Sequence, residues 1–105
     1  MELKIGPLSV PVIFGPLKEP DTFGFYSPYP KPTININNNL EPKIKAMTLL
    51  HEVLECLTDI YGWKMSEGDI RSLECALSMM VLENVEEIRG WLHDLQDAEH
   101  FDIKI

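Results

Sequence analysis

The sequence predicts one α+β domain over residues 1–105, in which a small antiparallel sheet packs on two to three helices. All eight prolines lie at or before Pro42, so a proline-punctuated half precedes a proline-free half. Short apolar runs occur in the first half, and longer stretches with helical apolar spacing occur in the second. With 105 residues and 45% hydrophobic content, the chain is long enough for one core. We expect strands and turns over residues 1–40 and helices over residues 41–105.

The first two expected strands surround the dipeptide Gly6-Pro7. Residues 2–5 and 10–14 are apolar runs of strand length, which is typical of a hairpin or of two adjacent edge strands. Pro11 has no backbone N–H, so it limits which edge of the second strand can pair. These residues therefore predict the start of the sheet.

A second pair of strands is expected at residues 23–26 and 33–37, on either side of the turn sequence SPYPKP. In TININ the apolar residues alternate, so Ile34 and Ile36 share one face, as in a half-buried strand. The three asparagines that follow predict a turn into the first helix.

The first helix is expected from Pro42 to Tyr61, because proline is favoured at a first helical position and Gly62 is a stop signal. Helical projection divides it into two sides. The apolar side holds Leu49, Leu50, Val53, Leu54, Cys56, Leu57, Ile60 and Tyr61. The polar side holds Thr48, His51, Glu52, Glu55 and Asp59.

Two further helices are expected. Ser66 and Asp69 form a capping box in which Asp replaces the usual Glu. The apolar stripe after that box comprises Ile70, Leu73, Leu77, Met80 and Val81. A third helix is expected from Asn84, capped with Glu87, to about Asp97. Its predicted packing face comprises Ile88, Trp91, Leu92 and Leu95. The final FDIKI fits either a short strand or a docked tail.

Charge is unevenly distributed along the chain. Residues 1–50 carry five Lys and four Asp/Glu, whereas residues 51–105 carry four Lys/Arg and thirteen Asp/Glu, which gives +1 and -9 and the total of -8. Nucleic-acid affinity depends on cationic side chains, so we expect no nucleic-acid partner and favour cations or basic proteins. We also expect no membrane partner and a cytoplasmic location, because the sequence has no long apolar run. Cys56 and Cys75 then fit reduced, structural thiols.

The sequence HEVLE in the first expected helix is one residue away from a zinc-peptidase motif. In HExxH the two histidines share a helix face and the glutamate serves as general base, but here Glu55 replaces the second histidine. Three interpretations remain open: a metal site with a changed ligand, a catalytic helix without its metal, or the polar side of an amphipathic helix. Glu67 and Glu74, seven residues apart on the next helix, lie where they can reach a neighbouring helix.

The order of these segments resembles the small phage-borne relatives of the ImmA/IrrE metallopeptidase family. The matching segments, in order, are KIG, GFYSPYPKPTININ, TLLHEVLECL and SEGDIRSLECALSMMVLEN, and the resemblance extends to about Trp91. The family resemblance implies a minimal zincin-like core, with a compact sheet beside the motif helix. It also implies a metal site completed from the following helix.

Carried over to this sequence, the resemblance implies metal ligation by His51 and Glu55, with Glu52 as the general base that takes a proton from metal-bound water. Glu74 is the expected third ligand, and Glu67 is the alternative. One imidazole and two carboxylates form a harder ligand set than the family's usual one. We therefore expect zinc to be held less selectively, with Mn or Mg accepted, or no metal held at all.

Two further histidines, His93 and His100, are expected to be surface or capping residues and not ligands. The expected function is metal-assisted hydrolysis of an amide bond in an extended protein substrate. The alternative is an inactive interaction or inhibitor protein on the same scaffold, which binds a host or phage protein through its acidic helices. DNA mimicry rests on the acidity alone and is the weaker third hypothesis.

Overall fold

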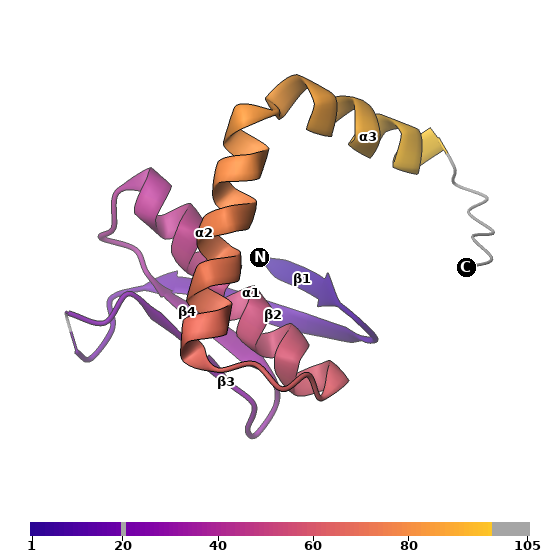
Figure 1. Cartoon of the computed structure of the whole chain (residues 1–105). Helices are drawn as coiled ribbons and strands as arrows, with labels where there is room; N and C mark the ends of the chain where they lie inside the picture. The colour runs from indigo at the N-terminus through magenta and orange to yellow at the C-terminus, as the bar shows by residue number, and fades with distance from the viewer. Residues whose placement is uncertain (20, 98–105) are drawn as a thin grey trace. The chain divides into compact units, whose positions relative to one another are not determined.

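The computed structural model describes residues 1–19 and 21–97, which contain four strands and three helices (Figure 1). Contacts divide the chain into two compact units, Met1–Cys75 and a second that begins at Ala76. The predicted α+β class is confirmed. The zincin-like core and the single domain stay predictions. Among the described residues, no helix is long and apolar enough to cross a membrane.

The sheet is mixed, so the prediction of an antiparallel sheet is wrong. Its strands are β1 (Glu2–Ile5), β2 (Leu8–Gly15), β3 (Gly24–Ser27) and β4 (Thr33–Asn37), in the spatial order β1-β2-β4-β3. The two expected pairs, β1 with β2 and β3 with β4, are antiparallel, but β2 and β4 pair in parallel. No turn joins β2 to β4 directly, so the direction of this pair is not imposed by a hairpin.

The turn between β1 and β2 depends on Gly6. Ile5 pairs with Leu8, so Gly6-Pro7 is a two-residue connection, and Gly6 adopts φ 59° in the left-handed region. A Cβ atom at Gly6 would also lie 2.8 Å from the Tyr61 hydroxyl oxygen. Both the backbone conformation and the close approach of Tyr61 therefore favour glycine here.

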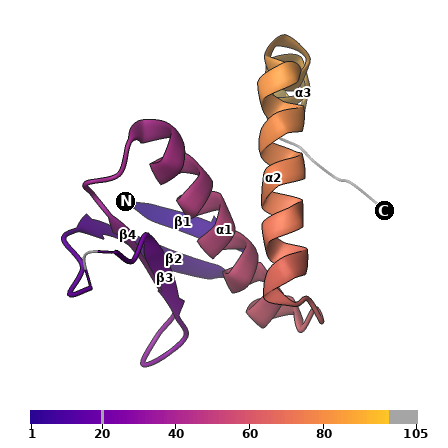
Figure 2. The same cartoon turned by 60° about the vertical axis from the view of Figure 1, so that its left-hand side comes forward.

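The core lies between the sheet and helix α1 (Pro42–Tyr61). Ile34 and Ile36 of the central strand β4 are fully buried, and Cys56 of α1 is buried beside them. The predicted bounds of α1 are confirmed, and Gly62 ends it in a left-handed conformation with φ 67°. α1 contacts β1, β3 and β4 and lies along the sheet (Figure 2).

Helix α2 (Glu67–Glu83) begins at the predicted capping box. The Ser66 backbone N–H donates to Asp69 Oδ2, and the Asp69 backbone N–H donates to Ser66 Oγ, both at 3.0 Å. Of the predicted apolar stripe, Ile70 is buried, whereas Met80 and Val81 are exposed. The first turn of α2 is thus held by its cap and by Ile70.

Helix α3 (Val85–Asp97) begins one residue after the predicted cap residue, and Asn84 Nδ2 donates to the Met80 carbonyl oxygen at 2.8 Å. No residue of α3 is buried, and Trp91 and Leu92 on its predicted packing face are exposed. The expectation that this face packs is therefore wrong for the described part of the chain. The predicted C-terminal FDIKI segment and His100 lie outside the described residues.

Candidate metal centre

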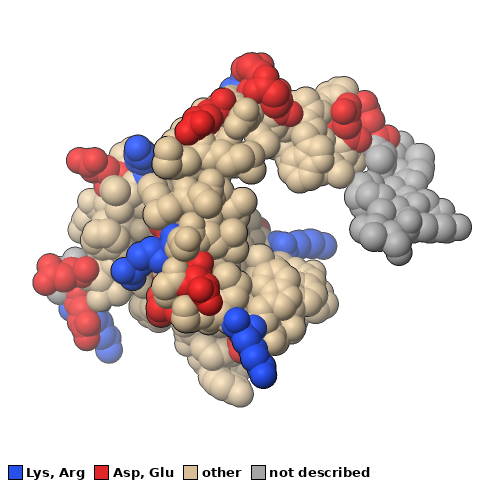
Figure 3. Space-filling view, viewed as in Figure 1, with Lys and Arg blue, Asp and Glu red and all other residues tan. Residues whose placement is uncertain are grey.

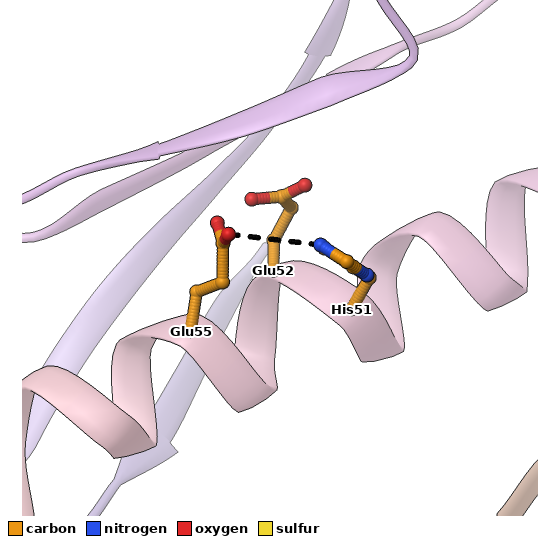
Figure 4. Close-up of side chains that lie close together, drawn as sticks. All are labelled: His51, Glu52 and Glu55. Atoms are coloured by element: carbon orange, nitrogen blue, oxygen red, sulfur yellow. Dashed lines mark ion pairs between the residues drawn. The ribbon is translucent and has the colours of Figure 1, made fainter. Parts of the chain in front are cut away.

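The motif helix brings three side chains of HEVLE together. His51, Glu52 and Glu55 extend from the same side of α1, and one ligand atom from each lies within 4.8 Å of the others (Figure 4). Residues three or four positions apart lie on the same face of a helix, so Glu55 is a neighbour of both His51 and Glu52. The distance from His51 Nε2 to Glu55 Oε1 is 3.6 Å.

This part of α1 is not a solvated polar surface. Thr48 and Glu52, both placed on the polar side by helical projection, are only 7% and 5% exposed. The interpretation of HEVLE as the exposed polar side of an amphipathic helix is therefore wrong for Glu52. Burial of an ionisable carboxyl is costly unless it has partners or is kept neutral.

Helix α2 supplies two carboxylates to the two sides of the His51 ring. Nδ1 lies 2.7 Å from Glu74 Oε1, and Nε2 lies 3.3 Å from Glu67 Oε2. The donor and acceptor roles of the two ring nitrogens depend on the tautomer: the form with the proton on Nδ1 donates to Glu74 and leaves the lone pair of Nε2 facing Glu67 and Glu55. In that tautomer Glu74 orients His51, and Nε2 is the atom available to a cation.

Glu67 and Glu74 differ in burial as well as in position. The Glu74 side chain is 13% exposed, whereas that of Glu67, in the first turn of α2, is 62% exposed. The capping bonds between Ser66 and Asp69 hold the turn that carries Glu67. Both carboxylates thus come from a helical segment whose start is fixed by sequence-local interactions.

Glu52 is the buried carboxyl of the cluster, and its Oε1 atom has no hydrogen-bond partner among the described residues. Burial raises the pKa of Glu52 from 4.5 to about 8, as do a hydrogen bond to Glu55 and the negative charges of Glu55, Glu67 and Glu74. In the metal-free protein at neutral pH, Glu52 is therefore largely protonated.

Glu55 and Glu67 are linked to Glu52 by hydrogen bonds between their carboxyl groups. Burial raises the pKa of Glu55, and a hydrogen bond to Glu67 raises it as well. Accepting the hydrogen bond from Glu55 lowers the pKa of Glu67, and the neighbouring His51 lowers it further. The raised pKa values of Glu52 and Glu55 favour their protonated forms, and a cation would displace those protons, whereas the lowered pKa of Glu67 favours its carboxylate.

A pocket opens beside the cluster. It is lined by Phe23, Gly24, Thr48, His51, Glu52, Arg71, Glu74 and Cys75. Gly24 begins β3 and lies close to α1, because a Cβ atom on it would come 3.0 Å from Thr48 Cγ2. Glu52 therefore combines burial with access to a space that an incoming molecule can enter.

The structure brings together every site residue that the sequence predicts: His51, Glu52, Glu55, Glu67 and Glu74. His93 belongs to α3 in the second unit, where it is exposed and near Asp94 and Asp97. The sequence reasoning missed Arg71, which lines the pocket. Its position, four residues after Glu67 and three before Glu74, was the available signal, because such spacing places all three on one side of a helix.

Comparisons with protein-family models, with curated proteins and with solved structures find no match for this chain. The relationship to the ImmA/IrrE family stays a prediction from the order of the segments. The function is therefore inferred from the geometry of the centre.

Proposed function

We propose that this protein binds a divalent metal ion at His51 and hydrolyses amide bonds in extended protein segments. The observation that carries the proposal is Glu52, a buried carboxyl whose Oε1 atom lacks a partner, located in a pocket beside His51. A buried, unpaired carboxyl oxygen is rare in folded proteins and commonly marks a functional site.

The spacing of the donor atoms fits a metal ion. A tetrahedral ion with ligand bonds of about 2.0–2.2 Å needs ligand atoms about 3.3–3.6 Å apart. His51 Nε2 lies 3.3 Å from Glu67 Oε2 and 3.6 Å from Glu55 Oε1. The geometry therefore supports His51, Glu55 and Glu67 as the ligand set.

Glu74 has a different part in this proposal from the one that the resemblance implied. Its carboxylate accepts a hydrogen bond from Nδ1 of His51, so it fixes the ring and increases the basicity of Nε2. Glu67, the alternative ligand in the sequence-based prediction, takes the third place. Because two of the three ligands are carboxylates, the site suits Mn or Mg as well as Zn.

The chain's own residues supply the acid–base chemistry. When bound, the ion would polarise the substrate carbonyl and acidify a water molecule. Glu52 accepts the proton and returns it to the leaving amine, and its burial beside the pocket suits a group that changes protonation state near neutral pH. A bound cation would lower the Glu52 pKa from its metal-free value, because it favours the ionised carboxylate.

Elemental analysis of protein purified without chelator or a histidine tag tests the proposal. We expect about one ion per chain in the wild type and in the control His93→Ala, and none in His51→Ala. Among conservative variants, Glu67→Gln should weaken metal binding more than Glu74→Gln, since a glutamine at 74 can still accept from Nδ1, and loss of an outer partner costs about 10–100-fold. A wild-type protein that binds no zinc, manganese or magnesium would sink the proposal.

A second candidate is a non-catalytic binding protein, and the exposed side chains of the second unit favour it. Acidic residues gather near the end of α2 and along α3, where Trp91 and Leu92 are also exposed (Figure 3). A basic protein partner would complement this combination. Stable capture of an intact partner by metal-free protein, unchanged in His51→Ala, would favour this candidate over hydrolysis.

A further inference from the structure

Arg71 is the one lysine or arginine among the residues that line the pocket beside Glu52. It lies on α2, one helical turn after Glu67, and is exposed. Within residues 1–19 and 21–97, its guanidinium makes no ion pair or hydrogen bond. An arginine at a pocket whose five donors form no hydrogen bond or ion pair with the described residues is available to a ligand.

The simplest alternative is that Arg71 merely balances the neighbouring acids. Glu67 and Glu74 both have the helical spacing for an ion pair with Arg71. However, both carboxylates are directed to His51, at 3.3 Å and 2.7 Å. The electrostatic influence of Arg71 on Glu67 is a weaker effect than the hydrogen bond from Glu55. Among the described residues, neither carboxylate therefore forms an ion pair with Arg71.

The pocket combines complementary polar groups with an apolar wall. Glu52 Oε1 is a buried oxygen without a partner, Arg71 carries only donors, and Phe23 lines the same space. A peptide group has an N–H donor and a carbonyl acceptor, so it matches an oxygen and a guanidinium together. A carboxylate ligand fits less well, because Glu52 and Glu74 lie in the same pocket.

We propose that Arg71 is a substrate-binding residue that donates a hydrogen bond to a carbonyl oxygen of a peptide entering this pocket. The inference rests on the proposed function, because it identifies a residue that would hold the amide substrate. It does not depend on the metal, because neither Arg71 nor the carbonyl needs an ion to form the hydrogen bond.

The test is a binding cycle on metal-free protein in the presence of a chelator. The probes are N-acetyl-phenylalanine methylamide and its two analogues in which one carbonyl is replaced by a thiocarbonyl, a poor hydrogen-bond acceptor. Affinities are measured by NMR titration for wild type, Arg71→Met, Arg71→Lys and the control Arg89→Met, which alters an exposed arginine on α3 paired with Glu86.

We expect one analogue to bind the wild type about tenfold more weakly than the amide, which is the effect of one charge-assisted hydrogen bond. Arg71→Met should bind the amide equally weakly and no longer distinguish it from that analogue. Arg71→Lys should recover part of the preference, and Arg89→Met should match the wild type. Circular dichroism spectra check that each variant is folded like the wild type. If Arg71→Met does not fold, the comparison is made with Arg71→Lys instead.

Two results would overturn the inference: no binding of the amide by the wild type, or equal discrimination against the analogue in wild type and Arg71 variants. Failure of the proposed function is distinguishable from both. If the protein binds no metal but Arg71→Met no longer distinguishes the amide from its analogue, Arg71 is still a peptide contact. If the protein binds metal but Arg71→Met discriminates against the analogue as the wild type does, the metal centre stands and only this inference fails.

Discussion

The protonation of Glu52 links the candidate centre to folding. Its carboxyl is 5% exposed and crowded by three other acids, so its neutral form is favoured in the metal-free fold. The unfolded chain has the ordinary Glu pKa, which lies below that of the folded state. The folded protein therefore binds more protons than the unfolded chain between these two values, and its stability falls as pH rises through them.

Glu52→Gln should remove this pH dependence from the metal-free protein. Glutamine keeps the neutral shape of the protonated acid but cannot ionise. At pH 8.5 we expect the variant to exceed the wild type in free energy of unfolding by on the order of 1–3 kcal/mol, whereas at pH 4.5 the two should be similar.

Urea unfolding at several pH values, with a chelator present, measures this difference. Glu83→Gln, at an exposed position near the end of α2, serves as the control and should follow the wild type. A Glu52→Gln variant that is less stable than the wild type at pH 8.5 would contradict the burial of a neutral carboxyl at this position.

At the scale of single residues, local spacing predicted much of the centre. His51, Glu52 and Glu55 meet because a helix returns to the same face after three or four residues. The different positions of Glu67 and Glu74 around His51 were not predictable, because spacing along the helix does not show which nitrogen of His51 each carboxylate approaches. Helical projection also gave no indication that Glu52 is buried, since burial depends on what packs over that side of α1.

At the scale of elements, the close approach of β3 to α1 helps form the pocket. A Cβ atom at Gly24 would lie 2.8 Å from the Asn35 carbonyl oxygen, 3.0 Å from Thr48 Cγ2 and 3.1 Å from Ile36 Cδ1. The first of these neighbours is a backbone atom of the paired strand β4 and cannot move independently of the sheet. The position therefore requires glycine for space and not for a left-handed conformation.

Gly24→Ala should lower the free energy of unfolding by about 1–3 kcal/mol, the typical cost of overpacking a well-packed site. Gly15→Ala is a matched control, because a Cβ atom at Gly15, which ends β2, meets nothing within 4 Å. Thermal or urea unfolding of both variants makes the comparison. Equal stability of Gly24→Ala and Gly15→Ala would show that β3 lies further from α1 than described.

Elements with strong local signals were the ones predicted well. Pro42 and Gly62 bound α1, and Ser66 with Asp69 starts α2, because proline, glycine and capping side chains act within a single turn. The parallel pairing of β2 with β4 was missed. The alternation in TININ identifies a buried face but contains no information on which strand lies alongside or in which direction.

At the scale of the whole molecule, the two compact units differ in how their apolar side chains are used. In Met1–Cys75, Ile34, Ile36 and Cys56 form part of a closed core. On α3, Trp91 and Leu92 are exposed, although the helical pattern predicted that they pack. An amphipathic pattern shows that a helix has an apolar side but does not show that the same chain covers it.

Leu92→Glu should therefore leave the folded state nearly unchanged. Leu92 is 48% exposed, so we expect a change within about 0.5 kcal/mol in the free energy of unfolding and an unchanged metal content. The comparison is Leu54→Glu, which alters a residue that is 6% exposed and should prevent stable folding. A large loss of stability in Leu92→Glu would show that this face of α3 is covered in solution.

The two cysteines lie in opposite environments, and this difference makes the native protein suitable for selective chemical labelling. Cys75 is exposed and lines the pocket, whereas Cys56 is fully buried and burial raises the pKa of its thiol. A thiol-reactive fluorophore or spin label should therefore attach to Cys75 and spare Cys56. The reporter would sit at the mouth of the candidate site without any change to the sequence.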